Sequence, residues 1–231
     1  MKYPKMILFD YGHTLLYEPG WDSARGNEQL LKYVTKNPNN CTLEDVRKGA
    51  ELIFGKHIES ARKIGYDISG QVGNKVLYEY LGIEFSLTPL EMETVFWNGA
   101  SMGAIMPDAD KMLDYINKNG IRSAVISNLL WSGAALTERL NRLLPNNQFE
   151  FVMTSSDYFV RKPNRILFDI ALQKAKLQSI IDFISNIETL INVEDEKIKR
   201  AFDGYRNSGV RQNFVNIGGR LICVDCYNAC E

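Results

Sequence analysis

The sequence predicts an α/β protein: a doubly wound parallel sheet with an inserted α-helical cap domain. Three observations predict this class. KMILFD, at residues 5–10, is an unbroken apolar run between polar residues, which is typical of a short buried parallel strand. From about residue 22 to 95 the sequence contains one helix pattern after another and no strand signal of comparable quality. After Met106, strand and helix patterns alternate, as in a doubly wound sheet.

Four helices are expected in the insert. SARGNEQLLKYVTKN (23–37) has a serine start signal and apolar residues at helical spacing. TLEDVRKGAELIFGKHIESARKIG (42–65) opens with Thr-x-x-Asp, which approximates a capping box. Two more helix patterns follow, GQVGNKVLYEYLGI (70–83) and TPLEMETVFWNGA (88–100). We therefore assign the cap to residues 17–96 and the core to residues 1–16 and 97–231.

The core resumes with a helix that starts at a proline and closes at Gly120, PDADKMLDYINKNG. A β-branched strand, IRSAVISN (121–128), comes next. The remaining elements are a helix SGAALTERLNRLL (132–144), a strand FEFVMTSS (149–156), a loop DYFVRKPN (157–164) and a helix RILFDIALQKAKL (165–177).

Charge and composition limit the function. The 27 Lys and Arg residues nearly balance the 28 Asp and Glu residues, so no global electrostatic field favours binding to nucleic acid or to an anionic membrane.

We find no signal peptide and no membrane-spanning run, and expect a cytoplasmic protein. The four cysteines are too few for a disulfide framework, and we interpret the C-terminal CVDCYNAC as ordinary reduced thiols because a structural zinc site needs four ligands. The sequence indicates no oligomeric state.

Polar residues follow each of the three strands expected in the core. The first strand ends at Asp10, the second at Ser127 and Asn128, and the loop after the third carries Arg161 and Lys162. The carboxyl ends of parallel strands converge on one crevice, where ligands bind. A carboxylate, a hydroxyl with an amide, and a cation suit a site that handles phosphate.

These motifs resemble those of the haloacid dehalogenase (HAD) superfamily. The first motif of that family has the form hhhDxDGT, the second is a strand that ends in Ser or Thr, and the third is a lysine, commonly followed by proline. Here they correspond to ILFDYGHTL, AVISN and RKPNRILFDIAL, with MPDADKMLDYINKNG as the helix before the second motif. The resemblance covers residues 5–16 and about 106–175. It implies a HAD-like Rossmannoid core, a hydrolase, and a helical cap between motifs one and two.

The resemblance also implies roles for individual residues. Asp10 would be the nucleophile that forms an aspartyl-phosphate, and Lys162 would neutralise charge on the nucleophile and the phosphoryl group. Ser127, with Asn128 beside it, would hold phosphoryl oxygens, and Thr14 would support the loop. The substrate would be a small phosphorylated metabolite.

The resemblance further implies Mg²⁺, held by Asp10, the backbone carbonyl of Gly12 and an acidic residue of a fourth motif. The C-terminal fifth departs from the family pattern there. IIDFISN has the expected distance from Lys162 but no carboxylate at its end, whereas VEDEKIKR has one but arrives late. We take Glu194 or Asp195 as the metal partner; the alternative is a solvated helix start.

The first motif departs from the family as well. The phosphatases carry a second aspartate as general acid and base, and here that position is Gly12. His13 is a candidate to transfer the proton instead; alternatively it only bonds to its neighbours in a tight turn. Two other functions stay open: a catalytically impaired member that binds a phosphorylated ligand or a protein, and a dehalogenase, whose halide leaves without a proton. For the dehalogenase, the candidate cap cations are Arg25, Arg47 and Arg62.

Overall fold

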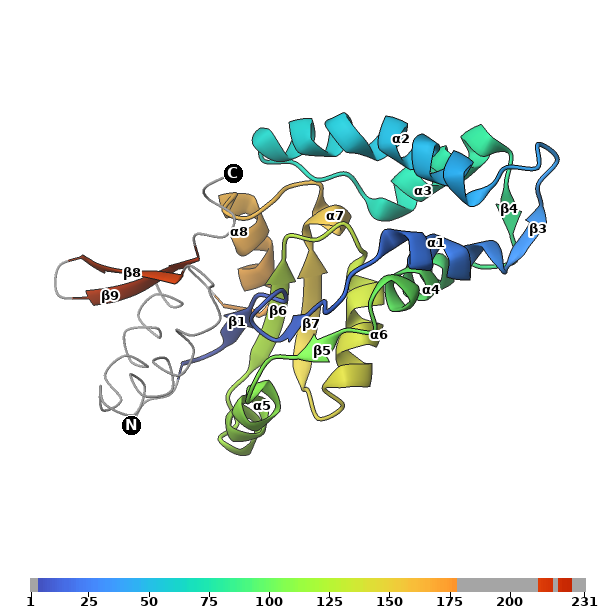
Figure 1. Cartoon of the computed structure of the whole chain (residues 1–231). Coiled ribbons are helices and arrows are strands. Elements are labelled where there is room, and N and C mark those ends of the chain that lie inside the picture. Colours follow the sequence, from blue (N-terminus) through green and yellow to red (C-terminus); the bar gives the residue numbers. More distant parts are fainter. Residues whose placement is uncertain (1–3, 178–211, 218–219, 226–231) are drawn as a thin grey trace.

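A three-stranded parallel sheet forms the centre of the molecule (Figure 1). The computed structural model describes residues 4–177, 212–217 and 220–225. Strand order is β1 (Ile7–Phe9), β6 (Ser123–Ser127) and β7 (Phe149–Thr154), with β6 in the middle. Ile7 pairs with Ser123, and Ser127 pairs with Thr154. All three strands therefore end at the same edge, as the sequence predicts.

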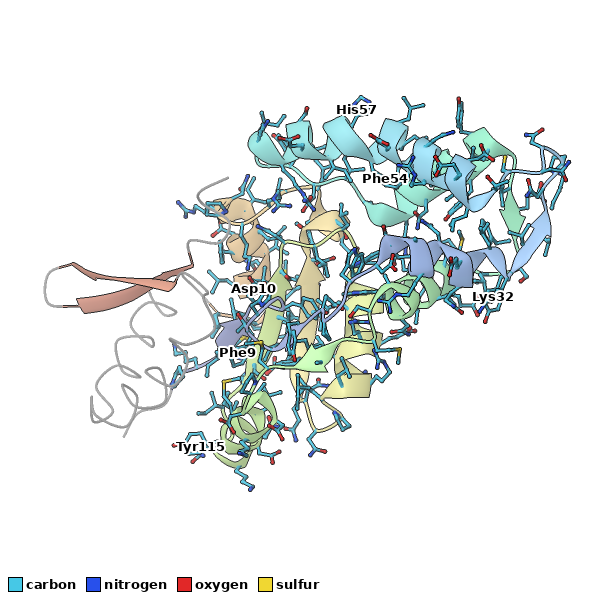
Figure 2. All side chains as sticks on the ribbon, viewed as in Figure 1. Phe9, Asp10, Lys32, Phe54, His57 and Tyr115 are labelled. Carbon is cyan, nitrogen blue, oxygen red and sulfur yellow. The ribbon has the colours of Figure 1, made fainter. Side chains whose placement is uncertain are left out.

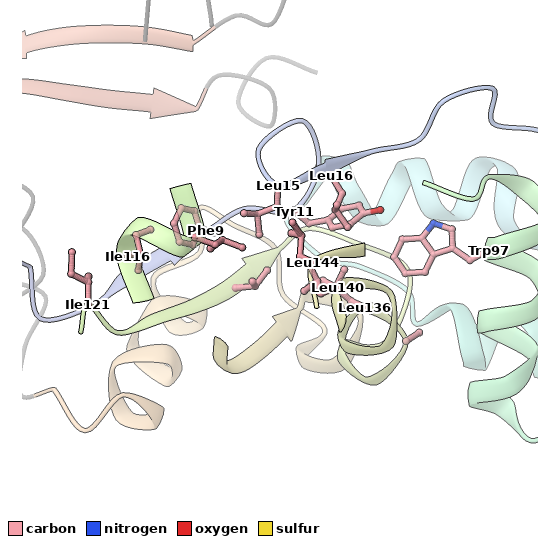
Figure 3. Packing of buried hydrophobic residues seen from close by; sticks show 13 residues of the cluster. Phe9, Tyr11, Leu15, Leu16, Trp97, Ile116, Ile121, Leu136, Leu140 and Leu144 are labelled. Carbon is pink, nitrogen blue, oxygen red and sulfur yellow. The ribbon is translucent and has the colours of Figure 1, made fainter. Parts of the chain in front are cut away.

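Helices cover both faces of this sheet, which confirms the doubly wound α/β class. Side chains alternate between the faces of a strand, and neighbouring residues of β6 enter different clusters. Val125 packs with residues of α5 (Ala109–Lys118) and α6 (Gly133–Leu143), and Ile126 packs with residues of α8 (Arg165–Lys174). Figure 3 shows the first cluster, which runs along the sheet to Trp97.

The helical insert, as we call the segment of α1 to α4, contains all four expected helices: α1 (Ser23–Leu31), α2 (Leu43–Lys63), α3 (Gly70–Leu81) and α4 (Pro89–Ala100). Thr42 and Asp45 form the predicted capping box of α2. The helices enclose their own apolar cluster, which includes Leu30, Val46 and Leu77. In Figure 1, α2 and α3 lie beyond the carboxyl-terminal edge of the sheet.

The insert is not entirely helical, which corrects the expectation of no strand there. Helix α1 ends at Leu31 rather than at residue 37, and β3 (Val34–Lys36) pairs antiparallel with β4 (Glu84–Phe85). The β-branched pair Val34 and Thr35 favours a strand once a partner is present, and that partner is distant in sequence. Two further departures from the expected elements are an antiparallel pair, β2 (Leu16–Tyr17) with β5 (Ala104–Ile105), and a short helix α7 (Ser155–Tyr158).

Helix α4 joins the insert to the core. Trp97 is 2% exposed and belongs to the core cluster, whereas Phe96 packs against the cluster of the insert. Within the insert, α2 and α3 approach closely at Gly73, where an added Cβ would lie 2.0 Å from Cε1 of Phe54. Only glycine fits there without a shift of that ring.

The strands β8 (Gln212–Ile217) and β9 (Arg220–Asp225) pair antiparallel near the carboxyl end of the chain. Among the described helices, none combines the length and apolar character required to cross a membrane. Cys41 is a free thiol. Cys226 and Cys230 lie outside the described residues, so the interpretation of the C-terminal cysteines stays a prediction.

Candidate active site

Asp10 directly follows β1 (Figure 2). Three donors, one from a strand end and two from loops, meet at its carboxylate. Ser127, the last residue of β6, donates its hydroxyl to Oδ1 of Asp10 at 2.8 Å. The backbone N–H of Tyr11 donates to the same oxygen at 2.7 Å. Lys162 places its Nζ 3.0 Å from Oδ2. The structure therefore brings together the three residues that the sequence predicts as nucleophile, hydroxyl donor and cation.

Lys162 is held by Asn128 from the neighbouring strand end. The Asn128 side-chain oxygen accepts from the backbone N–H of Lys162 at 2.7 Å, and its Nδ2 donates to the carbonyl of Lys162 at 3.1 Å. An amide bonded to both backbone groups of one residue constrains the backbone of that residue. Asn128 therefore joins the second and third motifs to each other, and its predicted contact with phosphate stays a prediction.

The side chain of Tyr11, the residue after Asp10, points away from the site and into the core. Tyr11 is 3% exposed and bonds to Glu18 and Arg139, whose guanidinium lies over the ring of Trp97. Burial, and then the Glu18 carboxylate, raise the pKa of the Tyr11 hydroxyl far above its usual value. Because its hydroxyl is bonded to Glu18 and Arg139 and its ring lies in the core, Tyr11 anchors the loop and does not stand in for the missing aspartate.

Gly12, His13 and Thr14 form a turn just after Asp10. Gly12 pairs with Leu16 through an isolated bridge, whose hydrogen bonds use backbone groups of Tyr11 and His13. These bonds do not use the carbonyl of Gly12. His13 is exposed and has φ of 55°, a left-handed conformation that glycine adopts at lower cost. Thr14 is half-buried, and its N–H donates to the carbonyl of Tyr11 at 3.3 Å.

The other predicted cations are engaged elsewhere. Arg161, expected beside Lys162 in the crevice, donates from Nη1 to Asp67 of the insert at 2.6 Å. Among the candidate cap cations, Arg25 bonds to the carbonyl of Ala100, Arg47 pairs with Glu44, and Arg62 lies 3.4 Å from Asp67. His57 is exposed on α2 and points away from the sheet in Figure 2.

The predicted metal partners Glu194 and Asp195 lie outside the described residues. Within the described part of the chain, no group of three His, Cys, Asp or Glu side chains is arranged to hold a metal ion. The ligands available there are the carboxylate of Asp10 and the carbonyl of Gly12. These hard oxygen atoms fit Mg²⁺, which retains several waters and takes few protein ligands.

Sequence reasoning missed a buried carboxylate next to the site. Asp67 is 1% exposed and accepts hydrogen bonds from Arg161 and from Ser155, which also bonds to the loop after Ser127. Its sequence context, GYDIS, has no motif, and Ser155 and Arg161, its partners on the core, are 88 and 94 residues away. A cavity of about 170 Å³ between α4 and α6 is also separate from the predicted site; its lining includes Trp97, Asn98, Arg139 and Arg142.

No family model and no curated protein matches this sequence. Solved structures with a similar arrangement include a HAD family enzyme from Bacteroides thetaiotaomicron, with a TM-score of 0.44 and 16% identity over 81% of this chain and 90% of that chain. A HAD-superfamily hydrolase from Ehrlichia chaffeensis has a TM-score of 0.38 and 20% identity, over 81% of this chain and 85% of that chain. A dehalogenase has a TM-score of 0.41 and 12% identity, over 76% and 73%. At these TM-scores the likeness carries no functional argument, and the chemistry rests on the residues of the site.

Proposed function

We infer that this chain is a hydrolase of the HAD type that removes the phosphoryl group from a small phosphorylated metabolite. The observation that carries this proposal is the carboxylate of Asp10, with the Ser127 hydroxyl 2.8 Å from one oxygen and the Lys162 ammonium 3.0 Å from the other. A carboxylate nucleophile splits one difficult displacement into two easier ones. The donors beside it are of the kind that stabilise phosphoryl oxygens as negative charge redistributes.

The proposed reaction has two steps. An oxygen of Asp10 attacks phosphorus, the bond from phosphorus to the leaving oxygen breaks, and the leaving group takes a proton. Water then attacks phosphorus of the aspartyl-phosphate, which releases inorganic phosphate and regenerates the carboxylate. Lys162 offsets charge in both steps, and Ser127 orients a phosphoryl oxygen. Mg²⁺, held by Asp10 and the Gly12 carbonyl, would offset further charge when bound; Glu194 or Asp195 is the proposed further ligand.

Gly12 restricts the choice of leaving group. A positioned acid contributes about 100- to 10,000-fold, and Gly12 has no side chain to supply it. Substrates whose leaving groups need little protonation, such as acyl phosphates, should therefore react best. His13 is the proposed source of a proton for poorer leaving groups. Its left-handed backbone supports this role, because strained residues that persist in a loop are concentrated at functional sites.

The proposal is tested with acetyl phosphate and 4-nitrophenyl phosphate in the presence of Mg²⁺. We expect turnover that disappears in Asp10→Asn, which keeps the shape of the side chain and removes the nucleophile. Addition of a chelator should lower the rate. Absence of turnover on both substrates in a folded protein that still binds phosphate would favour the binding-only function. Release of halide from a 2-halo acid, without phosphatase activity, would favour the dehalogenase.

A further inference from the structure

We propose that Asp67 is a positioning residue: this buried carboxylate of the helical insert holds Lys162 and Ser127 in place around Asp10. The inference rests on the proposed phosphoryl site and names a residue that none of its three motifs contains. Asp67 lies between α2 and α3 and is 1% exposed. A buried carboxylate is retained only with strong partners, and those of Asp67 lie on the core as well as the insert.

The first connection runs to the loop of Lys162. Arg161 donates from Nη1 to Oδ2 of Asp67 at 2.6 Å, and its backbone N–H donates to the carbonyl of Gly65 at 3.0 Å. The N–H of Asp67 in turn donates to the carbonyl of Phe159 at 3.0 Å. These bonds clamp the residues just before Lys162 to the insert. Arg161 and Lys162 are neighbours in the chain, and the ion pair of the first with Asp67 orients the second toward Asp10.

The second connection runs to the loop after Ser127. Ser155 donates its hydroxyl to Oδ2 of Asp67 and accepts from the backbone N–H of Leu129 at 2.9 Å. The N–H of Gly70, three residues after Asp67, donates to the carbonyl of Leu130 at 2.9 Å. The same carboxylate oxygen therefore reaches both catalytic loops, each through one intervening side chain.

Arg62 completes the surroundings of Asp67 from the insert itself, with its Nε 3.4 Å from Oδ1. Two guanidinium groups and one hydroxyl thus face a single carboxylate, and the core and insert each contribute. The Arg161 side chain is only 14% exposed, so removal of the Asp67 charge would leave it without a charged partner. It would also release the Lys162 loop and the loop after Ser127. Misplacement of a catalytic group by about 1 Å can cost on the order of 100-fold in rate.

The test compares Asp67→Asn with a matched variant, Glu93→Gln. Glu93 is also a fully buried carboxylate of the insert that bonds to the core, through the N–H and hydroxyl of Ser132 at the start of α6. Its described hydrogen bonds go to Ser132 and Gln71, and not to the Lys162 loop or to residues 127–130. We expect kcat on 4-nitrophenyl phosphate to fall about 10- to 100-fold in Asp67→Asn, and to stay within about twofold of wild type in Glu93→Gln. Both variants should lower the melting temperature. Asp67→Glu should recover part of the rate.

Binding of inorganic phosphate, measured by calorimetry, probes the same geometry without turnover. We expect about tenfold weaker binding in Asp67→Asn only. If Asp67→Asn does not fold, Ser155→Ala removes one of the two connections and should lower kcat several-fold. Wild type that binds phosphate without turnover, with binding weakened only in Asp67→Asn, would refute the proposed function and leave this inference standing. Three results would overturn the inference about Asp67. Rates and phosphate binding could be unchanged in Asp67→Asn, or Glu93→Gln could lose as much rate and phosphate binding as Asp67→Asn. The third result is that wild type does not bind phosphate.

Discussion

Restoration of an acid at position 12 is the sharpest test of why this site departs from the first motif of the HAD superfamily, which it resembles. The substitution Gly12→Asp places a carboxyl two residues after the nucleophile. The structure has room for it, because a Cβ built at Gly12 meets no heavy atom within 4 Å and the backbone there is not left-handed. Gly12 is also exposed, so we expect the free energy of unfolding to change by no more than about 0.5 kcal/mol.

The expected gain depends on the leaving group. Proton transfer by a positioned acid contributes about 100- to 10,000-fold, which corresponds to about 3–5 kcal/mol in the barrier. This gain should appear with an alkyl phosphate, whose leaving alkoxide needs a proton, and should nearly vanish with 4-nitrophenyl phosphate. If His13 already supplies part of the proton transfer, the gain should lie near the lower limit.

The assay is kcat/KM for a series of phosphate esters with increasing leaving-group pKa. Wild type should show a steep fall along the series, and Gly12→Asp a shallow one. Gly12→Asn is the control, because it has nearly the same shape and no transferable proton, so its profile should remain steep. Equal profiles for the Asp and Asn variants would refute the reasoning, since position 12 would then not face the leaving oxygen.

Three further predictions concern the loop, the insert and pH. His13→Ala should lower the rate on an alkyl phosphate by about tenfold or more and leave the aryl phosphate unaffected; an unchanged alkyl rate in steady-state assays would remove the imidazole from the mechanism. Gly73→Ala should lower the free energy of unfolding in urea by about 1 kcal/mol or more through the clash with Phe54, whereas in a Phe54→Ala background it should stabilise. Hydrogen bonds from the backbone N–H groups of the N-cap threonines lower the pKa of Asp45 and Glu91. The stabilisation that these two carboxylates provide is therefore complete at neutral pH and is lost as pH falls through their lowered pKa values. Thermal melts by circular dichroism should show acid destabilisation that is smaller in Asp45→Asn.

Much of the site could be predicted because its residues stand at strand ends. Apolar runs identify buried strands, and parallel strands end at one edge, so Asp10, Ser127 and the loop of Lys162 had to meet. Periodicity likewise identified the four helices of the insert. The short pair β3 and β4 could not be found in this way, because two or three residues carry no period and each strand depends on a partner distant in sequence.

The sequence by itself determined the order of the elements and the identity of the residues at the sheet edge, because both follow from local patterns. Only the tertiary structure decided the direction of each side chain. Adjacent residues point in different directions. Asp10 contacts Lys162, whereas Tyr11 enters the core. Lys162 contacts Asp10, whereas Arg161 bonds to Asp67. The physical reason is that burial of a charge requires a partner, and the partner of Arg161 belongs to a segment whose approach no local pattern encodes.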